Sequence, residues 1–281
     1  NSNKTIVDII QDEWHIFKDK DVAKILLSDI ISTSHLDYSI DTCVDYTNEI
    51  QDRVAVWDRL KNSVKENSRF FTNMDEFAQY EYLTAGKSLH IGQKLYRSRV
   101  TPIGQKKIKW DKMGCPPKEL TTAGRANPIG IPYLYLSDSA KTTYFEVRAV
   151  YLDKLSVGTF RIEKDLKLID FVYDVNLFLS YNDGSVPLKE TIIKKKVIEA
   201  ISSDLSKPLR RYDSEIEYVP TQLICEYCRR IVDSEGATAD GITFESSLHK
   251  GGRNYVLFDE SAAKCIRVDS HEITRIDIDR K

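Results

Sequence analysis

The sequence predicts an α+β protein in which a helical front part precedes a region of short strands. Glycine and proline are absent before Gly86, and apolar residues recur there at helical spacing, for example at Val54, Trp57, Leu60 and Val64. Later strands and helices do not alternate regularly, which is typical of α+β rather than α/β folds. We therefore expect a helical region over residues 1–90 and a second domain over residues 91–281.

Composition narrows the functional classes. The 281 residues include 41 Lys and Arg against 43 Asp and Glu, a formal charge of -2, and 41% are hydrophobic. This is ordinary globular composition, and the missing basic excess argues against a broad nucleic-acid-binding surface. Because the sequence has neither an apolar run of about 18 residues nor a signal peptide at its first residues, we expect a soluble, cytoplasmic protein that does not bind membranes.

The five cysteines favour a reducing compartment, because their number is odd and they are spread over a long chain. Cys225 and Cys228 form a CxxC motif, but they lie in an apolar run with helical spacing. No second CxxC or HxxxH motif completes a zinc site. We therefore interpret both as buried core thiols and expect no metal.

Residues 95–136 differ in amino-acid composition from the front part. They hold five of the eight prolines and four of the twelve glycines, so we expect a long irregular segment between strands. They also hold eight basic residues against two acidic ones, net +6, whereas residues 1–94 have a net charge of -5 that solvated helix faces explain. A local basic segment in an acidic protein favours an anion-binding site.

The remaining elements are predicted from the spacing of apolar residues and from the positions of capping residues, prolines and turn residues. A strand is predicted at 133–136, and Ser137, Asp138 and Ser139 start a helix over 140–150. Two strands are predicted within 158–171, and helices over 188–205 and from Pro220 to Ile231. Short strands are expected at 241–244, 255–258, 265–268 and 273–278.

Glu146 is the most informative single residue. On the predicted helix its neighbours at three and four residues are small or apolar, so its carboxylate needs a partner. A buried ion pair and a catalytic role explain it equally well.

Two glycine-containing segments could contact a ligand. Gly124 to Pro132 places one arginine and one asparagine between glycines and prolines, as in a phosphate cradle or an ordinary turn. Phe244 to Asn254 joins two strands through serines and glycines, which could hold ribose or amide groups or form a plain β-hairpin.

These segments, in their order, resemble the RES domain, a family named for an arginine, a glutamate and a serine. The resemblance covers about residues 93–262 and is carried by Tyr96-Arg97-Ser98-Arg99, Gly124-Arg125-Ala126-Asn127-Pro128, Leu134-Tyr135-Leu136-Ser137, Glu146, Asp240-Gly241-Ile242, Ser246 and Gly252-Arg253-Asn254-Tyr255-Val256-Leu257-Phe258. The resemblance implies a core similar to the split β core of diphtheria-type ADP-ribosyltransferases, with flanking helices. It also implies a toxin that consumes NAD, is restrained by an antitoxin and forms a homo-oligomer, with NAD as substrate and no metal.

The same resemblance assigns site residues. The catalytic set is Arg97, Glu146 and Ser246, and the NAD-binding set is Arg97, Arg99, Arg125, Tyr135, Ser246, Ser247 and Asn254. Arg99 is the rival of Arg97, and Ser247 is the alternative to Ser246. The chain departs from many family members at Glu245, where they have proline. Some members carry a HEPN-like helical region in front, and residues 1–90 resemble one without the Arg and His pair of active HEPN ribonucleases, so we do not expect RNA cleavage.

This set suits cleavage of the bond between nicotinamide and ribose, because a carboxylate can stabilise the positive charge that develops on the sugar. We therefore expect an NAD glycohydrolase that acts as a toxin or defence effector. One alternative is an ADP-ribosyltransferase with a macromolecular acceptor. A second is a non-catalytic module that senses a nucleotide.

Overall fold

The computed structural model describes residues 4–79, 82–172, 187–207, 215–232 and 236–275. The chain divides into two compact units. The first, the helical unit, comprises residues 1–56 and 173–197, and the second, the sheet unit, comprises residues 57–172 and 198–281. No helix in the described ranges combines the length and the apolar character that a membrane crossing requires.

The helical unit contains the π-helix η1 (Asp8–Glu13), α1 (Lys20–Thr33), α2 (Asn48–Val54) and the first half of α7 (Leu188–Ser206). The N-cap of α1 is Asp19, whose carboxylate accepts a hydrogen bond from the Val22 amide at 2.9 Å. Ala23 and Leu27, four residues apart on α1, are buried against Val7. Amphipathic spacing therefore explains this small core.

Charged side chains of the helical unit are paired with one another. Glu13 accepts hydrogen bonds from Lys4 at 2.6 Å and from Lys196. The guanidinium of Arg53, on α2, donates through both terminal nitrogens to the Glu190 carboxylate, with an Nη2–Oε2 distance of 2.7 Å. These contacts compensate the charges of these five side chains within the unit.

The sheet unit begins with α3 (Val56–Asn62), the π-helix η2 (Ser63–Asn67) and α4 (Asp75–Ala78). Trp57 of α3 is fully buried, and its indole nitrogen donates to Asp204 of α7 at 2.7 Å. The predicted helical character of the front part is thus largely confirmed. Residues near its end differ, because β1 (Ala85–Leu89) is a strand.

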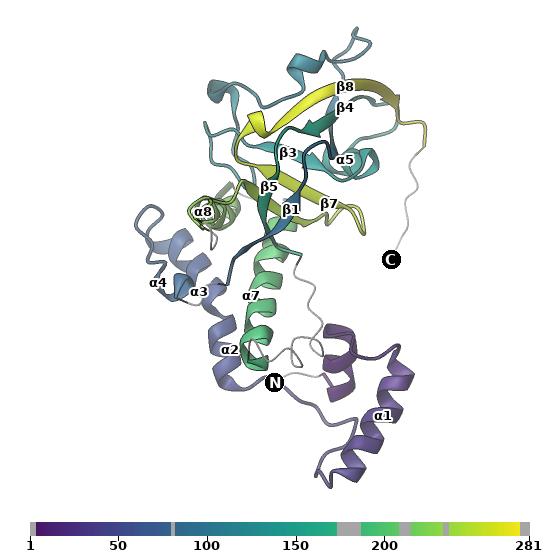
Figure 1. Cartoon of the computed structure of the whole chain (residues 1–281), viewed down its shortest axis with the longest axis vertical. Coiled ribbons are helices and arrows are strands. Elements are labelled where there is room, and N and C mark those ends of the chain that lie inside the picture. Colours follow the sequence, from purple (N-terminus) through teal and green to yellow (C-terminus); the bar gives the residue numbers. More distant parts are fainter. Residues whose placement is uncertain (1–3, 80–81, 173–186, 208–214, 233–235, 276–281) are drawn as a thin grey trace. The chain divides into compact units, whose positions relative to one another are not determined.

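Within the described residues, eight strands form one mixed sheet. The remaining strands are β2 (Lys94–Val100), β3 (Leu134–Ser137), β4 (Lys154–Ile162), β5 (Leu166–Asp170), β6 (Gly241–Glu245), β7 (Arg253–Leu257) and β8 (Ala263–Glu272). Their order is β1-β5-β6-β7-β3-β2-β4-β8 (Figure 1). The β5–β6 pair is parallel and the other pairs are antiparallel.

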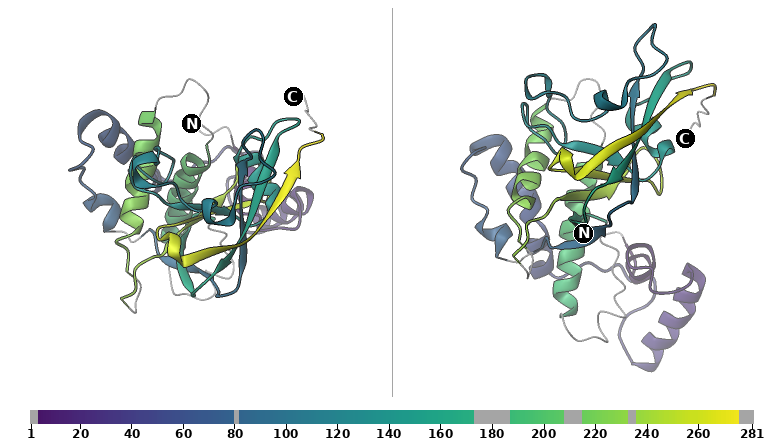
Figure 2. Two further views of the ribbon diagram at one scale, coloured as in Figure 1. Left: turned by 90° about the horizontal axis from the view of Figure 1, so that it is seen from above. Right: turned by 45° about the horizontal axis from the view of Figure 1, so that its top comes forward.

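A continuous apolar core lies on the sheet and includes Leu89, Leu134, Phe160 and Leu257. The long strand β8, yellow in Figure 2, runs along β4 for most of its length and forms the sheet edge. Helices α5 (Ala140–Glu146) and α8 (Val219–Cys228) and the 3₁₀ turns η3 (Trp110–Lys112), η4 (Lys118–Leu120), η5 (Glu215–Tyr218) and η6 (Glu260–Ala262) complete the described elements. The expected α+β class is confirmed at this level.

Several predicted elements are confirmed. Residues 158–171 lie in β4 and β5, the helix predicted over 188–205 is α7, and the segment from Phe244 to Asn254 connects the antiparallel strands β6 and β7. Cys225 and Cys228 are both fully buried in α8, and burial raises the pKa of each thiol well above its usual range. They are core thiols, as predicted.

Other predictions were wrong at their boundaries. The irregular segment begins only after β2. This strand was not recognised because basic residues interrupt its alternation of apolar and polar residues. The helix predicted over 140–150 ends at Glu146, and the helix predicted to reach Ile231 ends at Cys228. A single strand, β8, continues to Glu272 where two short ones were expected, and the predicted strand at 273–278 is not formed over 273–275, while 276–278 lie outside the described residues.

Candidate functional site

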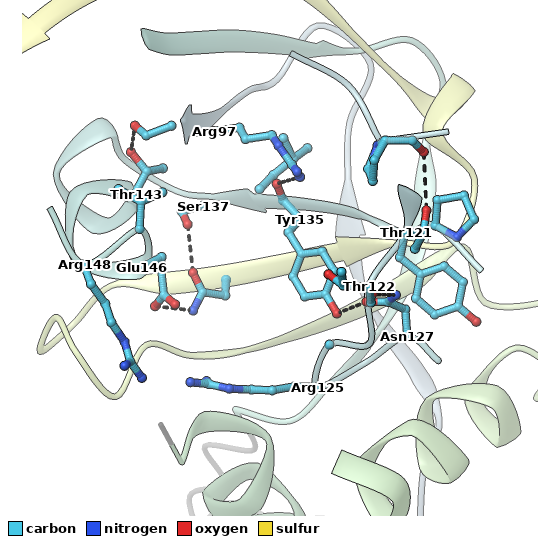
Figure 3. A pocket seen from close by; sticks show the side chains of 18 of the residues that line it. Arg97, Thr121, Thr122, Arg125, Asn127, Tyr135, Ser137, Thr143, Glu146 and Arg148 are labelled. Carbon is cyan, nitrogen blue, oxygen red and sulfur yellow. Dashed lines mark hydrogen bonds between the residues drawn. The ribbon is translucent and has the colours of Figure 1, made fainter. Parts of the chain in front are cut away.

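A pocket of about 580 Å³ lies in the sheet unit, within the range of about 300–1,000 Å³ usual for small-molecule sites. Its wall comes from β2, the loop before β3, β3 itself, α5 and the β6–β7 hairpin (Figure 3). Residues named from the sequence that line it are Arg97, Arg125, Tyr135, Glu146 and Asn254. Segments far apart in the sequence therefore supply one site.

Helix α5 positions Glu146. Its N-cap is Ser139, whose hydroxyl accepts a hydrogen bond from the Thr142 amide at 3.1 Å. The helix ends because Arg148 adopts a positive φ of 50°, and the Arg148 amide bonds back to the Phe145 carbonyl at 2.9 Å. Glu146 is thus the last residue of the helix, and the expected helical neighbours Ala149 and Val150 lie beyond its end.

The carboxylate of Glu146 is held through one oxygen. Ser246 Oγ donates to Glu146 Oε1 at 2.7 Å, and Asn254 Nδ2 donates to the same oxygen at 2.8 Å. Ser137 Oγ donates to Asn254 Oδ1 at 2.8 Å, which fixes the orientation of the amide. In the described part of the chain Glu146 Oε2 has no hydrogen-bond partner. The orientation of the carboxylate is therefore set while one oxygen can still bind a ligand.

The turn between β6 and β7 positions Ser246. Its hydroxyl accepts hydrogen bonds from the amides of Leu248 at 3.3 Å and His249 at 3.1 Å, and its amide donates to the Gly252 carbonyl. A Cβ at Gly252 would lie 2.6 Å from Thr142 Oγ1, so the turn packs closely on α5. Ser247 points elsewhere, because its hydroxyl donates to the Ser206 carbonyl. The structure brings Ser246 to Glu146 and not Ser247.

Arg97 lies on β2, where it pairs with Gly158 of β4. Its Nη1 donates to the Tyr135 carbonyl at 3.0 Å, while its buried Nε has no hydrogen-bond partner among the described residues. Burial, with the nearby charge of Arg99, lowers the pKa of Arg97 to about 10. Arg97 is therefore still charged at neutral pH, in a place where an anion would compensate it.

Arg99, the rival of Arg97, is on the same strand two residues on. Its Nη2 donates to the Gly114 carbonyl at 2.7 Å, and it does not line the pocket. Lys107 similarly donates to the Val268 carbonyl at 2.7 Å. Only two of the eight basic residues of 95–136 line the pocket, and these two others stabilise the irregular segment itself.

The loop before β3 holds Arg125 and Tyr135 together. Arg125 Nη1 donates to the carbonyls of Leu205 and Ser206 at 3.1 and 3.0 Å, at the carboxyl end of α7. Tyr135 Oη donates to Asn127 Oδ1 at 2.8 Å and accepts from the Ala126 amide, and burial raises the pKa of this phenol. A Cβ at Gly124 would lie 2.9 Å from the Tyr135 hydroxyl, so only glycine fits there.

Several residues in or beside the pocket were not predicted from the sequence as site residues. Ser137 orients Asn254, and His249 stacks on Phe145 with 5.0 Å between ring centroids and an interplanar angle of 7°. Arg148 also lines the pocket, although nothing in its sequence context distinguishes it from a surface arginine. Its position two residues after Glu146 is the only signal that could have drawn attention to it.

The arrangement places a fixed carboxylate and two arginines around one cavity. Neither Arg97 nor Arg125 forms an ion pair with an acidic side chain of the described residues. The described ranges also contain no group of three or more His, Cys, Asp or Glu side chains placed to hold a metal ion. The pocket thus has the groups to bind an organic anion and to stabilise a nearby positive charge.

Comparisons with known proteins place the chain in a family. No curated protein and no solved structure matches it. The sequence model of the RES domain matches residues 95–278, which is more than half of the 281 residues and includes every strand from β3 to β8. The chain therefore belongs to the RES domain family.

Proposed function

We propose that this protein is a toxin or defence effector that hydrolyses the bond between nicotinamide and ribose in NAD. RES domain proteins are generally NAD-degrading toxins. The observation that carries the proposal is the combination, in one pocket, of an arginine whose buried Nε has no hydrogen-bond partner among the described residues and a carboxylate oriented by two hydrogen bonds. The arginine suits a phosphate anion, and the carboxylate suits a developing cation.

In the proposed reaction the C1′–N1 bond breaks and its electron pair stays on the nicotinamide nitrogen, which becomes neutral. The ribose C1′ then carries positive charge, as in glycoside hydrolysis. Glu146 stabilises this charge and holds a ribose hydroxyl with Oε2. Water forms the new C1′–O bond and releases a proton, so the products are nicotinamide, ADP-ribose and one proton.

The remaining residues bind and orient. We assign Arg97 and Arg125 to the pyrophosphate, because a guanidinium can donate two parallel hydrogen bonds to phosphate oxygens. Tyr135 offers its ring, since its hydroxyl is already bonded to the loop. Ser246 and Asn254 set the carboxylate and contact the nicotinamide ribose. Arg99 and Ser247 have no part in this proposal, because neither lines the pocket.

We extend the proposal to the rest of the chain on the family alone. The sheet unit would have an ADP-ribosyltransferase-like core, residues 1–90 would be a HEPN-like region and residues 91–281 the catalytic domain. A toxin that consumes NAD would act in the cytoplasm, where its substrate is, would be restrained by an antitoxin and would self-associate. Co-purification with proteins of the source cell, followed by mass determination of the complex, tests the last two points.

The test of the activity is incubation of the purified full chain with NAD. We expect release of nicotinamide and ADP-ribose, and a loss of about 10²–10³-fold in kcat on Glu146→Gln, because an electrostatic stabiliser of the transition state is removed. Glu245→Gln is the matched control, since this exposed glutamate lies next to Ser246 and not in the pocket. It should leave kcat unchanged.

Other outcomes discriminate between the functions. ADP-ribose label found on a macromolecule would establish the transferase. A variant Glu146→Gln that is as active as the unchanged chain would contradict the assigned role of the carboxylate. Undisturbed NAD, both in vitro and in cells that express the chain without a growth defect, would exclude the proposed activity.

A further inference from the structure

The backbone at Arg148 is in a conformation that favours glycine. Its φ of 50° lies in the left-handed region, at the first residue beyond the C-cap of α5. Glycine is the usual residue at this position of a helix end, and an L-residue with a Cβ costs free energy there. A non-glycine residue in such a conformation at a pocket is an observation that points to a function of its side chain.

The side chain of Arg148 lines the same pocket as Glu146. In Figure 3 the guanidinium of Arg148 and that of Arg125 point toward one another, from α5 on one side and from the loop before β3 on the other. The left-handed turn directs the side chain of residue 148 into the pocket just after Glu146. A glycine there would terminate the helix equally well but would supply no cation.

Arg125 and Arg97 have different surroundings. Arg97 is bonded to the Tyr135 carbonyl and has a buried Nε, so it lies deep in the wall. Arg125 uses Nη1 for the two carbonyls at the end of α7, and it has no acidic partner among the described residues. Two guanidinium groups that face each other suit a phosphate between them, because each can donate hydrogen bonds to a different oxygen.

We propose that Arg148 is a substrate-binding residue that grips, together with Arg125, the phosphate groups of a nicotinamide nucleotide. This inference rests on the proposed function and adds Arg148 to the residues that bind the phosphates of its substrate, so that nicotinamide riboside, which has no phosphate, should bind more weakly than NAD. The folded chain bears the free-energy cost of the left-handed arginine whether or not a substrate is bound.

The first variant for the test is Arg148→Gly in the full chain. We expect its melting temperature to equal or exceed that of the unchanged protein, because the backbone cost is removed. The Kd for ADP-ribose and the KM for NAD should each rise about tenfold or more, while kcat changes by less than about threefold. Turnover of nicotinamide riboside, which has no phosphate, should not change.

A matched control tests the backbone alone. Leu152 has a φ of 70° and does not line the pocket, so Leu152→Gly should also keep or raise the melting temperature but leave Kd and KM unchanged. Arg148→Asn is a second variant in case glycine loosens the turn, because asparagine tolerates the left-handed conformation without supplying charge. It should weaken binding as glycine does.

The outcomes separate this inference from the proposed function. Arg148→Gly and Arg148→Asn variants that bind ADP-ribose and NAD as tightly as the unchanged chain would overturn the role of Arg148 while leaving hydrolysis intact. If the unchanged chain binds ADP-ribose through Arg148 but releases no nicotinamide, the proposed hydrolysis is wrong and the role of Arg148 in phosphate binding is supported. If it binds neither ADP-ribose nor NAD, both are wrong.

Discussion

Charged side chains are used differently in the helical unit and in the pocket of the sheet unit. In the helical unit Arg53 forms an ion pair with Glu190, and Glu13 forms ion pairs with two lysines. In the pocket, Arg97 and Arg125 donate hydrogen bonds to backbone carbonyls and form no ion pair with an acidic side chain of the described residues. A paired charge is compensated within the folded chain, whereas a partly buried cation without an acidic partner can gain a compensating charge from an anionic ligand. The contrast separates charges that are paired within the fold from charges to which we assign a role in binding.

The substitution with the largest expected effect is Arg97→Met, which keeps the side-chain volume and removes the charge. It tests whether Arg97 serves in binding or stabilises the fold. We expect the affinity for NAD to fall about 100-fold, because charge-assisted hydrogen bonds to phosphate are lost. The free energy of unfolding should not fall, since a buried charge without an acidic partner is removed. Calorimetric titration and chemical denaturation measure the two quantities. Reduced stability with unchanged affinity would make Arg97 a structural residue.

In the turn beside the pocket, Ser246→Ala and Ser247→Ala form a matched pair. Only Ser246 bonds to Glu146, so its loss should lower kcat about tenfold by freeing the carboxylate, whereas Ser247→Ala should change kcat by less than about twofold. Steady-state rates of nicotinamide release provide the comparison. Equal effects of the two substitutions would contradict the orientation proposed for Glu146.

Arg53→Met tests whether a paired charge of the helical unit stabilises the fold. It breaks the two-bond pair with Glu190 and should lower the free energy of unfolding by about 1–2 kcal/mol, with kcat per folded molecule unchanged. Lys189→Met removes an exposed pair with Glu49 and should cost at most about 0.5 kcal/mol. Denaturant titrations of both variants decide this, and a larger loss for Lys189→Met would reverse the expected ranking.

The smallest effect concerns pH. Burial alone would raise the pKa of Glu13, but hydrogen bonds from Lys196, Lys4 and Tyr46 lower it to about 2. The stabilisation is therefore fully present above the ordinary pKa of 4.5 and is lost as pH falls toward 2. Glu13→Gln should melt below the unchanged chain at pH 7, and the difference should close over that window. Melting curves that differ equally at pH 7 and pH 2.5 would exclude this linkage.

Much of the site was accessible from the sequence because its residues occur in a recognisable order. Glu146 and Ser246 could be named, and their hydrogen bond shows that they share one site. The choice between Arg97 and Arg99 depends on which side chain reaches the Tyr135 carbonyl, and that depends on strand pairing across the sheet. The role of Arg148 depends on a single φ angle at a helix end, which residue types alone do not determine.

Fold class and most elements were also predictable, because apolar periodicity marks α7 and the hairpin of β6 and β7. Strand β2 was missed because its alternation is interrupted by basic residues. The end of α5 was misplaced because Val147, Ala149 and Val150 continue the helical pattern past Glu146, while the left-handed residue that stops it is neither proline nor glycine.

The parallel pairing of β5 with β6 has a consequence for the order of folding. Leu168 pairs with Gly241, so the chain of residues 171–240 must be closed into a loop before these two strands can join. The β6–β7 hairpin needs only a short turn and should form much earlier. We expect refolding to assemble the turn that carries Ser246 and Asn254 first and to complete the sheet last, so during synthesis the pocket would form only after the β6–β7 hairpin has left the ribosome.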